Sequence, residues 1–79
     1  MKFEVRLPAM GEDATEEATV AYWPIEEGEV IHEGDDLVEL TTDKAAFSVP
    51  SPKTGTLVEK VVEEGDEVEV GDLICILDV

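Results

Sequence analysis

The chain has 79 residues, of which 43% are hydrophobic, and this length suits one domain with a single apolar core. Twenty-one acids against five bases give a formal net charge of −16, which argues against a nucleic-acid partner and disfavours an anionic membrane surface. Basic protein surfaces would instead be attracted, although solubility or adaptation to a salty or hot habitat accounts for the same excess of acids.

The elements expected along the chain are short strands. Residues 3–7 alternate apolar and charged, as a half-buried strand does, and residues 12–18 are polar and predict a surface loop. Residues 18–25 and 56–62 are rich in β-branched and aromatic side chains, which strands favour. Glu-Gly and Gly-Asp pairs punctuate the apolar runs, of which the last covers residues 73–77. No segment has convincing helical periodicity.

An internal repeat divides the chain into two similar halves. Residues 26–29 recur as residues 63–66, and residues 33–35 recur as residues 70–72. Because neither half could bury its apolar face alone, two equivalent sheets must face each other. The sequence therefore predicts one all-β domain over residues 1–79, a flattened barrel or sandwich with pseudo-two-fold symmetry. We expect its core to contain Trp23, Ile31, Leu40, Phe47, Val49, Leu57, Val68, Ile74 and Ile76.

The single cysteine and the single histidine predict neither catalytic nor metal chemistry. Cys75 lies in an apolar run and is expected to be a small buried thiol. His32 has no second histidine or cysteine beside it, so a metal site is not expected. The chain shows no run of membrane-spanning length and no signal-peptide pattern. We therefore expect a cytoplasmic location, or the mitochondrial matrix in a eukaryote.

The junction of the two halves carries the chemically distinctive residues, Thr42-Asp43-Lys44-Ala45. Strand-like runs flank Asp43-Lys44, which predicts the connection of a hairpin, where stability alone favours Asn-Gly or Asp-Gly. An exposed lysine beside Asp43 in an acidic protein stays charged and makes a poor catalyst. A merely solvated lysine is the ordinary interpretation. A lysine that another enzyme recognises and modifies explains the unusual turn better.

This junction resembles the lipoyl domains of 2-oxo acid dehydrogenase complexes. An isolated Asp-Lys-Ala would be weak support, but here it is set within a repeat and among glycines at matching positions. The similarity covers nearly the whole chain. It extends over residues 7–8, 11–12, 23–35, 42–45, 49–52 and 54–57.

The resemblance implies a barrel-sandwich hybrid of two four-stranded antiparallel sheets, with lipoic acid attached covalently to Lys44. Thr42, Asp43 and Ala45 would then form the surround that lipoylating enzymes recognise. The loop at about residues 10–17, with Gly11 and Glu12, would contribute to recognition by a decarboxylase. Two departures from the family pattern could alter partner preference. Thr41 stands where an acid is frequent, and Glu17-Ala18-Thr19 replaces Glu-Gly-Thr.

The resemblance further implies a carrier domain without its own active site, as part of a dihydrolipoyl acyltransferase subunit. A lipoate–protein ligase or lipoyl transferase would modify Lys44. The arm would then visit a thiamine-diphosphate-dependent 2-oxo acid decarboxylase, an acyltransferase catalytic domain and dihydrolipoyl dehydrogenase, with the cofactor supplying the thiol–disulfide chemistry. The lysine turn does not distinguish pyruvate, 2-oxoglutarate, a branched-chain 2-oxo acid or acetoin as the substrate. The sequence also leaves open whether the chain is a complete protein or an excised domain.

Three alternatives remain beside the lipoyl interpretation. A biotinyl carrier domain shares the architecture, but its signature is a methionine on each side of the lysine, where this chain has Asp43 and Ala45. The lipoyl-bearing carrier protein of glycine cleavage is longer and has different residues around its lysine. An unmodified hammerhead interaction module is disfavoured because the whole Thr-Asp-Lys-Ala turn is retained.

Overall fold

The computed structural model describes residues 1–8, 17–42 and 45–79, and these residues form strands and turns. That part of the chain includes no helix long and apolar enough to cross a membrane. The strands are β1 (Lys2–Arg6), β2 (Glu17–Tyr22), β3 (Val30–Ile31), β4 (Asp36–Thr41), β5 (Ala46–Pro50), β6 (Gly55–Lys60), β7 (Glu67–Glu69) and β8 (Leu73–Asp78).

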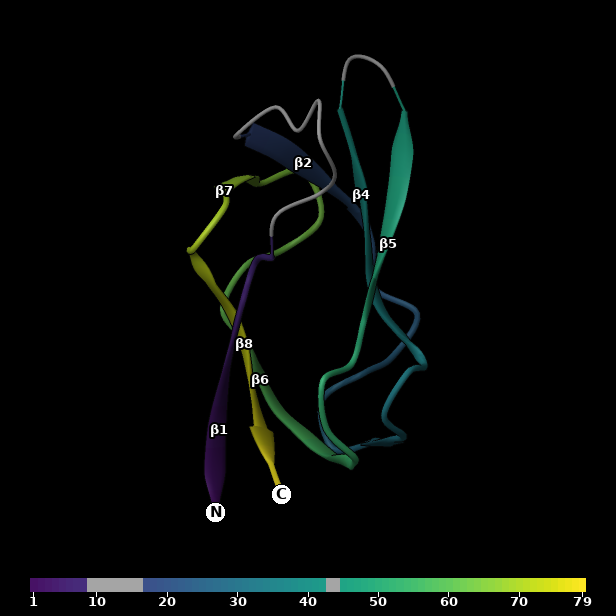
Figure 1. Cartoon of the computed structure of the whole chain (residues 1–79), viewed down its shortest axis with the longest axis vertical. Helices are drawn as coiled ribbons and strands as arrows, with labels where there is room; N and C mark the ends of the chain where they lie inside the picture. Colours follow the sequence, from purple (N-terminus) through teal and green to yellow (C-terminus); the bar gives the residue numbers. More distant parts are fainter. Residues whose placement is uncertain (9–16, 43–44) are drawn as a thin grey trace.

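The strands form two four-stranded antiparallel sheets that face each other (Figure 1). Sheet A has the order β1-β8-β6-β3, and sheet B has the order β5-β4-β2-β7. Strand β4 begins at Asp36 and β8 at Leu73, a shift of 37 residues that also relates β2 to β6 and β3 to β7. The expected all-β architecture of two equivalent sheets is therefore confirmed, and the sequence repeat is its origin.

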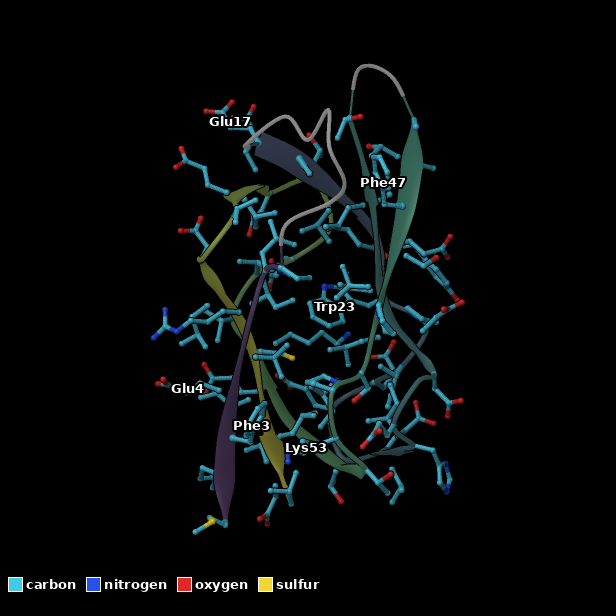
Figure 2. All side chains as sticks on the ribbon, viewed as in Figure 1. Phe3, Glu4, Glu17, Trp23, Phe47 and Lys53 are labelled. Carbon is cyan, nitrogen blue, oxygen red and sulfur yellow. The ribbon has the colours of Figure 1, made fainter. Side chains whose placement is uncertain are left out.

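The core lies between the sheets and includes seven of the nine residues expected there. Trp23 is 4% exposed and lies in the middle of the molecule (Figure 2). The expectation was wrong for Ile76, which is half-buried because the neighbouring Cys75 and Leu77 point inward instead. It was also wrong for Phe47, which is half-buried because it lies one pair from the end of the β4–β5 ladder, near the edge of the core. The other buried hydrophobic residues, outside that list of nine, are Val5, Leu7, Ala18, Val20, Ile25, Leu37, Val38, Cys75 and Leu77, of which Cys75 was expected to be buried as a thiol.

The strand limits differ from the expected ones, most clearly at the ends of β2 and β6 and at the start of β2. Strand β2 ends at Tyr22 and β6 ends at Lys60. Each of these strands is followed by a segment where the two halves cross. In these crossing segments Trp23 Nε1 donates to the Val62 carbonyl at 3.2 Å. The expected loop over residues 12–18 is wrong at its end, because Ala18 pairs with β7 and is buried. Residues 12–16 lie outside the described part of the chain.

Four turns of one design connect the strands. Each has glycine at its third position with φ between 91° and 94°, as a type II turn requires, because side chains other than glycine are strained there. Each has an acid at its fourth position, whose carboxylate accepts the backbone N–H of the first residue at 2.8–3.2 Å. The turns cover residues 26–29, 32–35, 63–66 and 69–72.

The same four turns clamp crossing segments of the chain. In each turn the glycine N–H donates to the carbonyl of one residue, and the N–H of that residue donates to the carbonyl at the fourth turn position. In the third turn Gly65 and Asp66 hold Val20 in this way, both at 2.8 Å. The residues held in the other three turns are Leu57, Ser51 and Leu7. Four of the acids therefore have a structural role that composition alone cannot show.

The chain ends meet at one end of the molecule. The Val79 N–H donates to the Met1 carbonyl at 2.8 Å, and the Met1 ammonium donates to Asp78 Oδ1 at 2.7 Å. The molecule measures 33 × 22 × 18 Å, and the ends of β4 and β5 at Thr41 and Ala46 lie at the opposite end of the long axis (Figure 1). In the repeat, the shift of 37 residues makes Thr42, at the end of β4, equivalent to Val79 at the end of the chain.

Candidate functional site

The β4–β5 hairpin is an antiparallel ladder that extends to the end of the molecule. Its last strand pairs are Leu40 with Phe47 and Thr41 with Ala46. The ladder continues for one more pair, because the Thr42 N–H donates to the Ala45 carbonyl at 2.8 Å. Only positions 43 and 44 lie between the two members of that pair in the sequence.

The predicted lysine site falls on those two residues. Asp43 and Lys44 lie outside the described residues, as do Gly11 and Glu12 of the predicted recognition loop. What the structure places is the pair that closes the segment, Thr42 and Ala45. Assignment of the modified residue to Lys44, and of recognition to the other positions, stays a prediction at this point.

The Thr42 side chain adds a second contact to the closing pair. Its hydroxyl accepts the Ala45 N–H at 3.2 Å, and it lies 3.2 Å from the Ala45 carbonyl oxygen, to which it can donate. Thr42 is half-buried and Ala45 is exposed. One hydroxyl therefore contacts both backbone groups of Ala45, so the Thr42 side chain helps to hold together the two ends of the segment that contains Lys44.

The described part of the chain offers little chemistry of its own. Cys75 is confirmed as a buried thiol, and burial raises its pKa to about 12, so it remains protonated and unreactive at neutral pH. His32 is exposed, with Nδ1 3.6 Å from Asp35 Oδ2. Among the described residues no group of three or more potential ligands could hold a metal ion.

A shallow cavity of about 490 Å³, which the sequence did not predict, lies where the two halves cross. Lys60 Nζ lies 3.0 Å from Glu26 Oε2 and 5.8 Å from the centre of the Trp23 ring. Trp23 and Lys60 occupy equivalent positions of the two halves, again 37 residues apart. These contacts give Lys60 a role in joining the halves. The cavity is lined by Tyr22, Trp23, Pro24, Glu26, Glu27, Lys60, Glu63 and Glu64.

The sequence of this chain is similar to that of a known family and of known proteins. A family described as "Biotin-requiring enzyme", which combines biotin and lipoyl domains, matches residues 3–77. The chain is 47% identical over 74 residues to the dihydrolipoyllysine-residue succinyltransferase component of the 2-oxoglutarate dehydrogenase complex of Bartonella vinsonii subsp. berkhoffii. It is 42% identical over 78 residues to the dihydrolipoyllysine-residue acetyltransferase component of the pyruvate dehydrogenase complex of Staphylococcus aureus strain Mu50. These matches cover 94% and 99% of the chain, which spans only 18% of each relative.

A solved structure matches the domain from end to end. The lipoyl domain of the 2-oxoglutarate dehydrogenase complex from Azotobacter vinelandii superposes with a TM-score of 0.74 at 30% identity, covering 96% of this chain and 95% of that one. The three relatives are all of the lipoyl type, which favours the lipoyl interpretation over the biotinyl alternative. The chain therefore belongs to the biotin/lipoyl family, as one of its lipoyl carrier domains.

Proposed function

We propose that Lys44 carries lipoic acid in amide linkage, and that the chain is the swinging-arm domain of a dihydrolipoyl acyltransferase subunit. The observation that carries this proposal is the closed Thr42–Ala45 pair, which has Asp43-Lys44 as the only residues between its members. This pair ends a hairpin that lies opposite the chain termini (Figure 1), in a fold that a lipoyl domain shares along its whole length.

The surroundings of the hairpin fit such a group. Thr41, Ala45 and Ala46 are exposed, so the end of the hairpin is open to the enzymes that an arm would have to reach. The bound group supplies reversible thiol–disulfide and acyl-thioester chemistry. The protein contributes the point of attachment, and tethering in a complex raises the effective concentration of the arm at each active site.

The proposed partners follow from this role. They are a lipoate–protein ligase or lipoyl transferase, a thiamine-diphosphate-dependent 2-oxo acid decarboxylase, an acyltransferase catalytic domain and dihydrolipoyl dehydrogenase. The relatives include both a succinyltransferase and an acetyltransferase component, so the proposal names the class of 2-oxo acids and no single member. The proposed location is the cytoplasm, or the mitochondrial matrix in a eukaryote.

Co-expression with a lipoate–protein ligase in the presence of lipoate tests the assignment. Intact mass and peptide mapping should show one lipoyl increment on Lys44, which Lys44→Arg abolishes. Lys53→Arg and Lys60→Arg are matched controls and should leave the increment in place; these two lysines lie over the rings of Phe3 and Trp23. An unmodified wild-type chain beside an active ligase would sink the proposal. A parallel incubation with a biotin–protein ligase would then test the biotinyl alternative.

A further inference from the structure

The two sheets share one architecture but differ in charge. Sheet A combines bases and acids in equal number along its strands, whereas the strands of sheet B contain acids and no lysine or arginine. The charged residues of the sheet A strands are Lys2, Glu4, Arg6, Glu59, Lys60 and Asp78. Those of the sheet B strands are Glu17, Asp36, Glu39, Glu67 and Glu69.

Because the sheets are related by the repeat, the charge at each position of sheet B can be compared with that at the equivalent position of sheet A. Glu39 of sheet B corresponds to Ile76 of sheet A, 37 residues later, and Glu67 corresponds to Val30, which is 62% exposed. Solubility requires charge, but it gives no reason for two equivalent sheets to differ in this way. The distribution therefore favours a partner for sheet B over a general solvating role of its acids.

The acids of sheet B lie on its outer face. Ala18 and Val20 of β2 are buried, while Glu17, the first residue of the strand, is exposed and pairs directly across from Glu69 of β7. The pair therefore places two acids side by side on this face. The face also presents the small exposed side chains of Ala46 and Ser48, beside β4.

This outer face is continuous with the hairpin end. Glu39 pairs with Ser48, and two residues further along the same face Thr41 pairs with Ala46. The Thr42–Ala45 pair follows immediately. An enzyme that reaches the residue at position 44 can therefore contact the outer face of sheet B without crossing the molecule.

We propose that the outer face of sheet B is the surface on which the lipoate–protein ligase docks, through lysines and arginines at the rim of its active site. The inference rests on the proposed function of Lys44. Attachment requires an activated acyl donor made with ATP, in which the carboxyl group is joined to AMP. The lysine amine displaces AMP, forms the amide and releases a proton. Because cationic side chains hold phosphate anions, we expect the rim of such a site to be positive and to attract a face whose strands carry acids and no lysine or arginine.

Variants that neutralise two acids in one sheet or the other test the docking surface. The sheet B variant is Glu39→Gln with Glu67→Gln, and the matched sheet A variant is Glu4→Gln with Glu59→Gln, so both change the net charge equally. The binding constant for a bacterial lipoate–protein ligase and the KM and kcat of lipoylation are measured at low and high salt. We expect the sheet B variant to bind about fivefold more weakly, with a matching rise in KM and an unchanged kcat. The sheet A variant should remain within about twofold of wild type, and salt should abolish the difference.

The outcomes separate this inference from the proposed function. Equal losses in both variants would show that net charge alone matters and would overturn the docking surface. A wild-type chain lipoylated at Lys44, with neither variant impaired, would overturn the docking surface and leave the proposed function standing. A wild-type chain that neither binds the ligase nor is lipoylated would overturn both proposals. Thermal unfolding by circular dichroism establishes that both variants are folded.

Discussion

Thr42 stabilises the hairpin at a point where the neighbouring sequence is not one that hairpins prefer. Two-residue connections favour Asn-Gly or Asp-Gly, and here the residues are Asp43-Lys44. We expect Thr42→Val, which keeps the shape of the side chain and removes the hydroxyl, to lower the free energy of unfolding by about 1 kcal/mol. It should also speed hydrogen exchange of the Ala45 N–H, which the hydroxyl accepts.

Two matched variants control this prediction. Thr42→Ser retains the hydroxyl and should restore exchange protection at Ala45, whereas Thr41→Val alters an exposed strand threonine and should change stability by less than about 0.5 kcal/mol. Urea titration and amide exchange measured by NMR provide the readouts. Equal protection of Ala45 in the valine and serine variants would contradict the role of the hydroxyl.

Cys75 makes stability depend on alkaline pH. Burial raises the pKa of its thiol to about 12, while the thiol of the unfolded chain keeps its ordinary value of 9.0. Below pH 9 the thiol is protonated in both states and has no effect on the balance. Above pH 9 only the unfolded chain releases the proton, so the free energy of unfolding falls as pH rises, by at most about 1.4 kcal/mol per pH unit.

The check is urea unfolding of wild type and Cys75→Ala between pH 8 and 10.5. The alanine variant is less stable at pH 8 because it leaves a cavity, but its stability should decline less steeply with pH. Parallel pH profiles for the two proteins would rule out this thiol as the cause. A thiol reagent at pH 8 should label wild type only after unfolding.

Among the elements, the four turns account for how acids stabilise an already acidic chain. Asp66 accepts the Glu63 N–H at 2.9 Å and, through its backbone, holds Val20 of β2. We expect Asp66→Ala to lower the free energy of unfolding by about 1 kcal/mol, because the Glu63 N–H loses its partner. Glu64 is another acid of the same turn, and Glu64→Ala should lower the free energy of unfolding by less than about 0.5 kcal/mol.

The repetition of the turn design allows a further check by denaturant titration. Asp35 has the same role in the second turn, where its carboxylate accepts the His32 N–H at 3.2 Å. Because the two turns hold different segments, the losses in an Asp35→Ala, Asp66→Ala double variant should add. A loss as large in Glu64→Ala as in Asp66→Ala would mean that the turns respond to local charge and not to the hydrogen bond.

The elements also show where sequence patterns stop being informative. The glycine spacing predicts the turns because only glycine adopts their positive φ without strain. The unbroken apolar run at 73–77 has no alternation, so it cannot distinguish the inward Cys75 from the half-buried Ile76. Ala18 and Gly55 are equivalent in the repeat, yet a Cβ on Gly55 would lie 2.5 Å from the Asp78 carbonyl oxygen. Such close approaches depend on packing that no local pattern records.

For the whole molecule, the sequence predicted the paired sheets and the position of the hairpin, since both follow from the repeat and from alternation. It did not predict the contact of Lys60 with Trp23, because residues 37 positions apart meet only after the halves have crossed. Nor did it predict the contrast in charge between the sheets, because the strands that form one sheet are not consecutive in the chain. The modified lysine is predicted from its sequence context alone, and the structure adds the pair that closes its segment.

The contact between the chain ends makes stability depend on acidic pH. The N-terminal ammonium, which donates to Asp78, lowers the pKa of that carboxyl group, and Lys2 lowers it further. A lowered pKa in the folded state adds stability above the ordinary pKa of the unfolded carboxyl, and this stability is lost as pH falls through the folded value. We expect Asp78→Asn to flatten the acid side of the stability profile between pH 5 and 2. Asp36→Asn, which leaves this contact intact, should retain the wild-type slope.

Because both termini emerge at one end of the 33 Å axis and the hairpin forms the other, the molecule has a built-in polarity for attachment. A tag, linker or support joined to either terminus leaves from the same end, away from Thr42 and Ala45. Domains anchored to a bead or a sensor chip through one terminus would all stand upright with the hairpin outward. Their reactivity should then be independent of which terminus is used, and a uniform layer of this kind would report enzymes acting on the hairpin without correction for blocked orientations.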